Sequence, residues 1–432
     1  MAAVRISLRA AVAADVLVRL LLVTVAGWQR GAIAFLVDDS AGYRILARHL
    51  AFDGAFLDRW GSGKPELFRT PGYPLLLVPG MWAGQPVAFA IALNLLASMA
   101  IVILTYHLAR RLLDERLAGL CALVVALEPT MLTWSLKVMP ETLFTLCLLL
   151  FTAAALQALE TRQAKWIVAA AMAMVAAAYL RPIAYPLVFV IALAAFFAMG
   201  ARRGLVFLLT AAALLAPWHL RNALQTGYAG FSTVTERSLY VSAGGAVLAA
   251  RENRPFAEVR AELLEQGRLR DSAADAAHHG TMARKGLALI ASNPLAWAKA
   301  HARGMLRTLF DPGAAAYLRL FGLYSAGARP AGSTAGVQAM ARAYPLVFWS
   351  SAALAVVLLP LIFLPVVGAF RVPRERRTAF VLVALIAGYL VFASGGPPGN
   401  YRFRAPVVPF LALMSGFAAL RRRASSGRLL RT

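Results

Sequence analysis

The sequence predicts an all-α polytopic membrane protein, and three observations support this fold class. The first is composition: of 432 residues, 60% are hydrophobic and 15% are charged, which is too apolar for a soluble protein. The second is that the apolar residues form long runs, close to the length that spans a bilayer. Because backbone polar groups in lipid must be hydrogen-bonded within their own segment, these runs are expected to be helices.

The third observation is where the positive charge lies. The formal net charge is +24. Much of it falls in clusters at the ends of apolar runs, namely Arg110, Arg111 and Arg116; Arg162 and Lys165; Arg202 and Arg203; Arg371, Arg374, Arg376 and Arg377; and Arg421, Arg422 and Arg423. All lie on one side of the predicted membrane together with both termini, which is the positive-inside pattern and argues against nucleic-acid binding. We expect a multi-pass protein of the inner or plasma membrane with cytoplasmic N- and C-termini.

The apolar runs give ten candidate spans in order along the chain. The first contains Asp15 and Arg19, four residues apart, where they can pair on one helical face. Since no small-residue cleavage site follows, we expect a retained span and not a signal peptide. The ten spans are 10–35, 86–109, 117–133, 140–159, 166–181, 183–199, 204–218, 345–369, 378–394 and 405–420.

Two long segments, 38–85 and 219–344, fall on the side opposite the basic clusters. The second has helix starts at Pro255 and at Asn293-Pro294, the latter opening a helix over 295–310. We expect amphipathic helices that lie over the mouth of the bundle. The predicted organisation is an N-terminal transmembrane module over 1–218 with a catalytic first external loop at 38–85, an external helical segment over 219–344, and C-terminal transmembrane helices with a basic tail over 345–432.

The first external loop opens on the acidic pair Asp38 and Asp39. Either carboxylate can cap a helix over 40–51, whose Tyr43 belongs to an apolar stripe opposite Arg44 and Arg48. A capping role alone would account for the pair. The functional interpretation is a general base, a partly desolvated carboxylate that accepts a proton from an attacking hydroxyl near the lipid headgroups.

The same loop returns to the membrane through Phe-Arg-Thr-Pro-Gly-Tyr-Pro at 68–74, where two prolines around a glycine enforce a turn. Pro74 can sit at the start of a helix over 75–82. Arg69 is either a snorkelling side chain or a ligand for a lipid phosphate, which a guanidinium binds in bidentate fashion. Lys64 is a weaker phosphate candidate, since Gly-Ser-Gly-Lys is followed by proline and is not a P-loop.

Further polar side chains fall at the outer ends of spans. Glu141 begins the fourth span, where the helix dipole alone would favour a carboxylate. Arg181 lies where an apolar run turns back, and an arginine at that depth needs a partner or water. Outward arginines at positions 221, 402 and 404 suit a lipid phosphate, although ion pairs with Glu141 or Asp39, or ordinary headgroups, would also explain them. His219 at the outer interface is a weaker candidate acid–base group.

Six short motifs, in this order, resemble the GT-C glycosyltransferases related to the protein O-mannosyltransferases (dolichyl-phosphate-mannose mannosyltransferase-like proteins) and the aminoarabinose transferases. They are Asp-Ser-Ala-Gly-Tyr at 39–43, Arg-Thr-Pro-Gly-Tyr-Pro at 69–74, Lys-Val-Met-Pro-Glu at 137–141, Leu-Arg-Pro at 180–182, Ala-Pro-Trp-His-Leu-Arg-Asn at 216–222 and Tyr-Arg-Phe-Arg-Ala-Pro at 401–406. The resemblance covers most of the chain and implies a GT-C-like bundle.

The resemblance further implies transfer of a sugar from a polyprenyl-phosphate carrier to an acceptor on the periplasmic or extracellular face, with inversion. Asp39 matches the family's catalytic aspartate. Ser40 stands where the family has a glutamate, so Asp38 and Glu141 are both candidates for a second carboxylate. Tyr43, Tyr401 and the arginines of the motifs fall in the region that would bind the lipid phosphate. The acceptor can be a lipid, a glycan or a protein.

Two other function classes stay open. A flippase or transporter of lipid-linked sugars would also use outward arginines and a carboxylate, but it should carry polar residues along the middle of several spans. Here most spans are Ala, Leu and Val at their centres, which favours chemistry at one face. A non-catalytic partner in envelope assembly is the third class. No metal-binding motif or cofactor fingerprint occurs in the sequence, so no cofactor is predicted.

Overall fold

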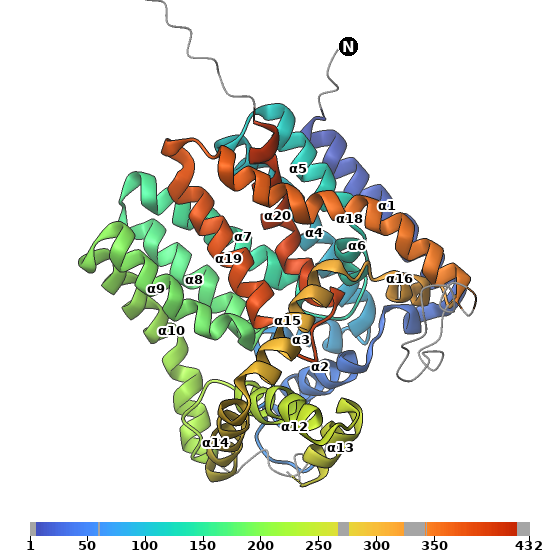
Figure 1. The fold of residues 1–432 in the computed structure, drawn as a ribbon, viewed down its shortest axis with the longest axis vertical. Coiled ribbons are helices and arrows are strands. Elements are labelled where there is room, and N and C mark those ends of the chain that lie inside the picture. Colours follow the sequence, from blue (N-terminus) through green and yellow to red (C-terminus); the bar gives the residue numbers. More distant parts are fainter. Residues whose placement is uncertain (1–5, 59–60, 267–275, 324–341, 343, 421–432) are drawn as a thin grey trace, which may run out of the picture.

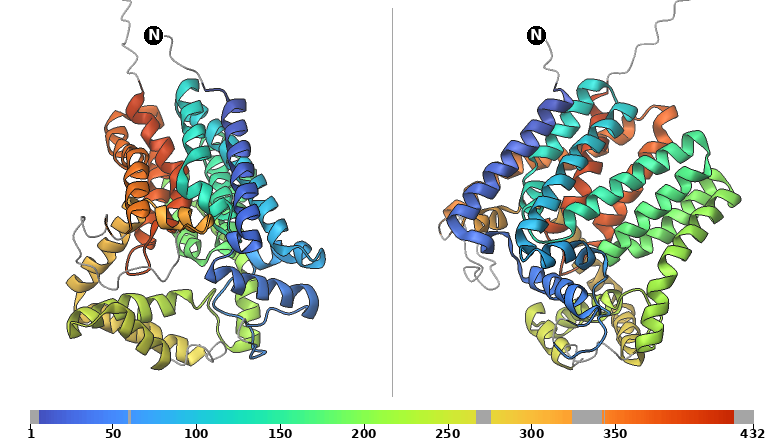
Figure 2. Two further views of the ribbon diagram at one scale, coloured as in Figure 1. Left: turned by 90° about the vertical axis from the view of Figure 1, so that its right-hand side faces the viewer. Right: turned by 180° about the vertical axis from the view of Figure 1, so that it is seen from behind.

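The computed structural model describes residues 6–58, 61–266, 276–323, 342 and 344–420, and the basic cluster at 421–423 lies outside these residues. The described residues contain helices and no strand; the one β-bridge joins Leu57 to Pro65. A bundle of long helices stands side by side, and shorter helices lie across one of its ends (Figures 1 and 2). The fold class predicted from the sequence is therefore confirmed.

The bundle is built from helices at both ends of the chain. Its members are α1 (Leu8–Arg30), η1 (Gly31–Phe35), α4 (Pro86–Leu112), α5 (Glu115–Leu127), α6 (Pro129–Ser135), α7 (Glu141–Thr161), α8 (Ala164–Leu180), η3 (Pro182–Ala184), α9 (Tyr185–Met199), α10 (Ala201–Thr226), α18 (Pro345–Arg371), η6 (Arg374–Arg376), α19 (Arg377–Ala393), η7 (Tyr401–Val407) and α20 (Val408–Ala419). In the bundle α7 packs against α8 and α4, and α20 packs against α18 and α5, so the C-terminal helices close the core.

Every one of the ten predicted spans has a helical counterpart, but not every counterpart qualifies as a membrane span by its own length and composition. Among the described residues seven segments are long and apolar enough. An eighth crossing forms if α5 and α6, which meet at a bend of 52°, are counted as one broken span. The two others are short: α8 has 17 residues and α20 has 12. The protein is a multi-pass membrane protein; among the described helices seven or eight segments meet this criterion by themselves, and the ten predicted spans include the two shorter helices as well.

The basic loops meet at one end of the bundle. Arg111, at the end of α4, donates to Glu160 near the end of α7 at 2.8 Å. Arg376, between α18 and α19, donates to the carbonyl oxygen of Leu112 at the same end of α4. The loops that the positive-inside pattern places together along the sequence are thus also together in space.

A buried polar cluster supports the first helix within the bundle. Asp15 and Arg19 form the ion pair predicted from their spacing, and each side chain is 1% exposed. Ser98 of α4 donates to the Asp15 carboxylate at 2.9 Å, while Arg19 donates to Ser135 at 2.9 Å and to the carbonyl oxygen of Ala126 at 2.7 Å. These bonds offset the cost of burying two charges and link α1 to α4, α5 and α6.

The end opposite the basic loops carries an outer layer of short helices. Near the start of the chain these are α2 (Asp38–Arg48), η2 (His49–Asp53) and α3 (Gly72–Trp82); later come α11 (Val234–Arg237), η4 (Ser238–Gly244), α12 (Gly245–Glu252), α13 (Phe256–Gln266), α14 (Ala276–Ser292), α15 (Pro294–Phe310) and α16 (Ala314–Leu320). As predicted, Asn293 caps α15, its side chain accepting from the Ala296 N–H at 3.0 Å. The sequence showed no compact core here, but Tyr240, Val241, Val259 and Leu263 pack into a small one.

Candidate active site

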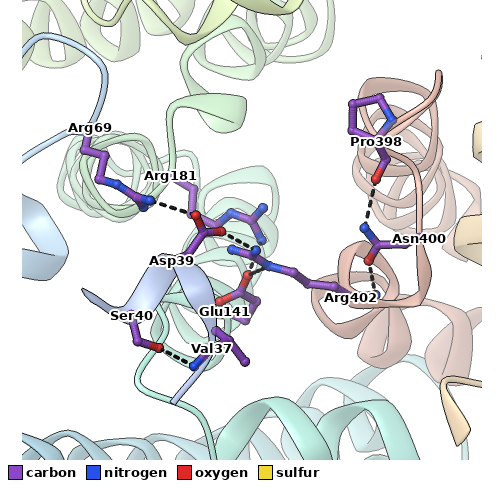
Figure 3. Close-up of polar contacts among 9 residues, drawn as sticks. All are labelled: Val37, Asp39, Ser40, Arg69, Glu141, Arg181, Pro398, Asn400 and Arg402. Atoms are coloured by element: carbon purple, nitrogen blue, oxygen red, sulfur yellow. Dashed lines mark hydrogen bonds and ion pairs between the residues drawn. The ribbon is translucent and has the colours of Figure 1, made fainter. Parts of the chain in front are cut away.

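The first turn of α2 places Asp39 at the mouth of the bundle. The sequence predicted a helix from residue 40 with Asp38 or Asp39 as its cap, and this was wrong by two residues. The helix begins at Asp38 after Val37, and the Ser40 hydroxyl accepts the Val37 N–H at 3.0 Å. With the cap supplied by Ser40, both carboxylates lie within the first turn, where the helix dipole stabilises negative charge. Asp39 is then free to point toward the bundle (Figure 3).

Two arginines that are far apart in sequence form ion pairs with the Asp39 carboxylate. Arg69 Nη2 lies 2.8 Å from Oδ1, and Arg402 Nη1 lies 2.7 Å from Oδ2, so each carboxylate oxygen has its own guanidinium (Figure 3). The Asp39 side chain is still 41% exposed, whereas Arg69 is 7% exposed. Asp39 is therefore the member of this group that a molecule from outside the bundle can reach.

A second, buried carboxylate lies behind Arg402. Glu141, the first residue of α7, is fully buried, and its Oε1 accepts from both Arg402 and Arg181. The Arg181 contact measures 3.2 Å, and the Arg181 guanidinium lies 5.5 Å from the centroid of the Phe144 ring and 5.2 Å from that of the Phe403 ring. Arg402 is thus held by two carboxylates, the fully buried Glu141 and the more exposed Asp39.

The ion cluster of Asp39, Arg69, Glu141, Arg181 and Arg402 has three guanidinium groups and two carboxylates, a formal charge of +1. Burial alone would raise the pKa of the Asp39 carboxyl, but Arg402 and Arg69 outweigh burial and hold that pKa well below its usual range. Asp39 is therefore ionised in this arrangement. The excess positive charge makes the cluster suitable for an additional anion.

Aromatic rings form the walls of the ion cluster. The Arg69 guanidinium lies 4.0 Å from the centroid of the Tyr43 ring, whose edge packs on Tyr73 with the centroids 5.1 Å apart. On the other side, Arg402 lies 5.2 Å from the centroid of Trp134. Cation–π contacts of this kind stabilise partly desolvated guanidinium groups and restrict their rotamers. Arg69 and Arg402 are thereby held in place independently of Asp39.

The backbone before η7 sets the position of Arg402. Asn400 caps this short helix, accepting the Arg402 N–H at 2.9 Å and donating to the carbonyl oxygen of Pro398 at 2.8 Å (Figure 3). The loop packs tightly on α15: a Cβ added at Gly304 would lie 2.0 Å from the carbonyl oxygen of Gly396. Only glycine at 304 permits this approach, so α15 of the outer layer positions an arginine of the ion cluster.

Several buried polar atoms around the cluster have no hydrogen-bond partner among the described residues. They are Arg69 Nε, Tyr73 Oη, Trp134 Nε1 and Glu141 Oε2. Buried polar groups in proteins are nearly always satisfied by protein, water or a ligand. Four such atoms around one charged cluster indicate a site that accommodates water or a polar ligand.

A cavity of about 240 Å³ opens beside Asp39 on the side of the outer layer. Its lining includes Asp39, Phe68, Arg237 and Arg260. The two last residues were missed in the sequence, because they lie in helices that look like solvated amphipathic surface. Only their place in the lining of the cavity beside Asp39 marks them.

The structure places the other predicted site residues outside the ion cluster. Asp38 is exposed on the first turn of α2, and Lys64 is exposed on the loop before Pro65. His219 lies 2.7 Å from the carbonyl oxygen of Ala229, beside Tyr185 and Phe231. Tyr401 is half-buried and packs on Trp134, with the ring centroids 5.9 Å apart.

Arg221 binds backbone carbonyl oxygens and does not belong to the ion cluster. Its guanidinium donates to the carbonyl oxygens of Glu66 and Phe56, each at 2.8 Å, and lies 4.8 Å from the Trp218 ring centroid. These bonds tie α10 to the segment between α2 and α3, just before Arg69. We infer that Arg221 supports the loop that carries Arg69.

Arg404 points away from Asp39, although it stands only two residues after Arg402. It is 1% exposed and donates to the carbonyl oxygens of Thr308, Leu309 and Asp311 at 2.6–3.2 Å. Its Nε also lies 3.5 Å from the buried Glu128 carboxylate. These partners are the end of α15 and the start of α6, so Arg404 joins the outer layer to the bundle.

We therefore predict that Arg404→Met lowers stability. The change leaves Glu128 without its counter-ion and three carbonyl oxygens without a donor, and removing one partner of a buried pair costs about 3–5 kcal/mol. Thermal unfolding of the detergent-solubilised protein should shift to a clearly lower temperature. Arg307→Met, an exposed arginine of α15, is the matched control and should leave the unfolding temperature unchanged. Equal stability of the two variants would contradict the structural role of Arg404.

Part of the chain is similar to a known protein family. The family model of dolichyl-phosphate-mannose-protein mannosyltransferases matches residues 82–220, about a third of the chain. Among curated proteins, none matches the sequence. The family match includes the helices that supply Glu141 and Arg181.

Solved structures share the fold at low sequence identity. The Archaeoglobus fulgidus oligosaccharyltransferase in complex with Zn and sulfate superposes with a TM-score of 0.52 and 14% identity, covering 94% of this chain and 48% of that one. ArnT from Cupriavidus metallidurans bound to undecaprenyl phosphate gives a TM-score of 0.41 and 15% identity, covering 93% and 77%. The chain spans about half the length of the oligosaccharyltransferase. The resemblance to GT-C glycosyltransferases predicted from the sequence is confirmed.

Proposed function

We propose that this protein is a membrane glycosyltransferase that moves a sugar from a polyprenyl-phosphate carrier to an acceptor hydroxyl, with inversion and with Asp39 as the general base. The main observation in support of this proposal is the ion cluster, in which an accessible carboxylate pairs with Arg69 and Arg402 at one end of a membrane bundle. Support also comes from the family model, whose members use a lipid-phosphate sugar.

The position of the ion cluster suits a lipid-linked donor. A polyprenyl tail lies in the bilayer, so its phosphate is presented at a membrane surface and between helices. The cluster is at the helix ends opposite the basic loops, which by the positive-inside rule would face the periplasm or cell exterior. With a charge of +1 and three guanidiniums, it offers bidentate donors to the phosphate.

The donor phosphate would also activate Asp39. In the described arrangement both Asp39 oxygens accept from arginines, which lowers the pKa of the carboxyl and makes it a poor base. A phosphate that binds Arg69 and Arg402 shares their positive charge with a second anion. The pKa of Asp39 then rises toward its ordinary value, and the carboxylate becomes a stronger base when the donor is present.

The transfer itself is a single displacement. The acceptor oxygen attacks the anomeric carbon, its proton passes to Asp39, and the bond from the anomeric carbon to the phosphate oxygen breaks. The electron pair leaves with the polyprenyl phosphate, whose growing charge Arg402 and Arg181 stabilise. Preorganised donors aimed at developing charge are among the largest contributions to catalysis. Glu141 holds these two arginines in place.

The function is tested with purified protein in nanodiscs and radiolabelled sugars on polyprenyl phosphate. We expect the label to leave the carrier, to water or to an added acceptor, and the free polyprenyl phosphate to accumulate; a nucleotide sugar such as GDP-mannose should yield nothing. The alternative function, transport of the lipid-linked sugar, is tested in proteoliposomes. Movement of the intact lipid-linked sugar across the bilayer, without cleavage of the sugar–phosphate bond in any of the mannosyl, glucosyl or galactosyl donors, would support a flippase instead.

A further inference from the structure

We propose, resting on the glycosyltransferase activity above, that the acceptor carries a phosphate group, and that this phosphate binds between Arg237 and Arg260 in the cavity beside Asp39. The cavity has about 240 Å³, enough for a polyol phosphate. Its polar lining consists of the Asp39 carboxylate, two guanidinium groups and the hydroxyls of Ser238 and Ser242. An acceptor bound there would present a hydroxyl to the base.

The elements around the cavity hold these donors in fixed positions. Arg237 ends α11, and Ser238 and Ser242 belong to η4, a π-helix, a conformation that occurs often at functional sites. All three side chains line the cavity, and Ser242 lies about one helical turn after Arg237 and Ser238. Arg260 comes from α13, which packs on η4 through the small core of Tyr240, Val241, Val259 and Leu263.

The charge in the cavity favours an anion. Asp39 is the only carboxylate that lines it within the described residues, and Asp39 is already paired with Arg69 and Arg402. The cavity side of Asp39 therefore faces two guanidinium groups. Arg237 lies 4.9 Å from the centroid of Phe68, a contact that orients it. Arg260 forms no ion pair with a described residue, and Glu262, two residues later, pairs with Arg254 at 3.0 Å.

The cavity also lies on the side of Asp39 that an acceptor must occupy. The donor side is defined by Arg69, Arg402 and the buried Glu141, at the end of the bundle. The cavity lining comes from residues 39 and 68 and from the outer layer, without any membrane-crossing helix. In an inverting displacement the nucleophile and the leaving phosphate are on opposite sides of the anomeric carbon. A phosphate held by Arg237 and Arg260 thus belongs to the acceptor and not to the lipid donor.

The test measures binding directly, with glycerol phosphate and glycerol as a charged and a neutral probe. Protein in nanodiscs of zwitterionic lipid is titrated with each probe and followed by saturation-transfer NMR. We expect wild type to bind glycerol phosphate at least tenfold more tightly than glycerol. Arg237→Gln combined with Arg260→Gln should lower the affinity for glycerol phosphate about tenfold, whereas Arg251→Gln, an exposed arginine of α12 outside the cavity, should not.

Three outcomes would overturn the proposal: equal binding of the two probes by wild type, equal binding of glycerol phosphate by wild type and the double variant, or loss of binding only in Arg402→Gln, which would place the anion on the donor side. Addition of phosphatidylglycerol distinguishes the source of the phosphate, because a lipid headgroup acceptor would displace the soluble probe. Donor cleavage by wild type is measured separately. If wild type does not cleave the donor, the proposed glycosyltransferase function is wrong. The probe titrations test the anion site independently of that result.

Discussion

Asp39→Asn is expected to lower the rate of sugar transfer by about 10²- to 10⁴-fold, the contribution typical of a general base. Asparagine keeps the size of the side chain, and its one oxygen still accepts a hydrogen bond from Arg69 or from Arg402, so the fold and the donor site should survive. It cannot take the proton of the acceptor. It also removes one negative charge from the ion cluster, so the affinity for the polyprenyl-phosphate donor should stay equal or increase.

The measurement is single-turnover transfer with saturating donor, next to donor binding for the same protein samples. Asp38→Asn is the matched control, one residue earlier on the same helical turn but exposed and outside the ion cluster. Transfer that persists in Asp39→Asn and disappears in Asp38→Asn would assign the base to Asp38. Loss of donor binding along with transfer would show that Asp39 organises the arginines and does not act as a base.

The residues of the ion cluster could be selected from the sequence because each is chemically unexpected at a span end. An outward arginine at 181 or 402, or a carboxylate at 141, needs a partner near lipid. The sequence left open whether that partner was a ligand or another protein side chain. The structure shows that the arginines pair with Asp39 and Glu141, one of the alternatives predicted, and that the set still has an excess of positive charge.

The difference between Arg402 and Arg404 could not be predicted. Both arginines belong to the same motif at 401–406. They lie on a 3-10 helix, in which side chains two residues apart point in different directions. One side chain reaches Asp39 and Glu141, and the other reaches carbonyl oxygens at the end of α15. Which direction each takes depends on the close contact between Gly304 and Gly396, residues that are 92 positions apart and carry no local signal of their pairing.

Length and apolarity alone select fewer of the described helices than the ten predicted spans, for a physical reason. Apolar runs indicate burial from water, whether the neighbour is lipid or protein. The helix α20 has 12 residues, and most of its side chains are buried against α18, α19 and α5. Its hydrophobicity therefore serves the protein interior. Arg237 and Arg260 show that polar residues can equally be misjudged from the sequence. Their helices look like ordinary solvated surface, but in the fold both residues line the cavity beside Asp39.

Arg402→Gln is expected to lower transfer by about 10²- to 10³-fold, as loss of a preorganised donor to a developing oxyanion does. It should also destabilise the protein, because Glu141 is fully buried and would keep only the Arg181 contact at 3.2 Å. Loss of one partner of a buried ion pair costs about 3–5 kcal/mol. Activity per folded molecule and the thermal unfolding temperature must therefore be measured together.

The double variant Arg402→Gln with Glu141→Gln separates these two effects. Removing the second charge leaves no unpaired carboxylate in the interior, although Arg181 then keeps only a neutral amide oxygen as its acceptor. Part of the lost stability should therefore return, as expected for coupled neighbours in a double-mutant cycle. Transfer should stay low, because the guanidinium that faces the leaving phosphate is still missing. If the double variant recovered transfer together with stability, Arg402 would have only a structural role, and the stabilisation of the leaving group would fall to Arg69 and Arg181.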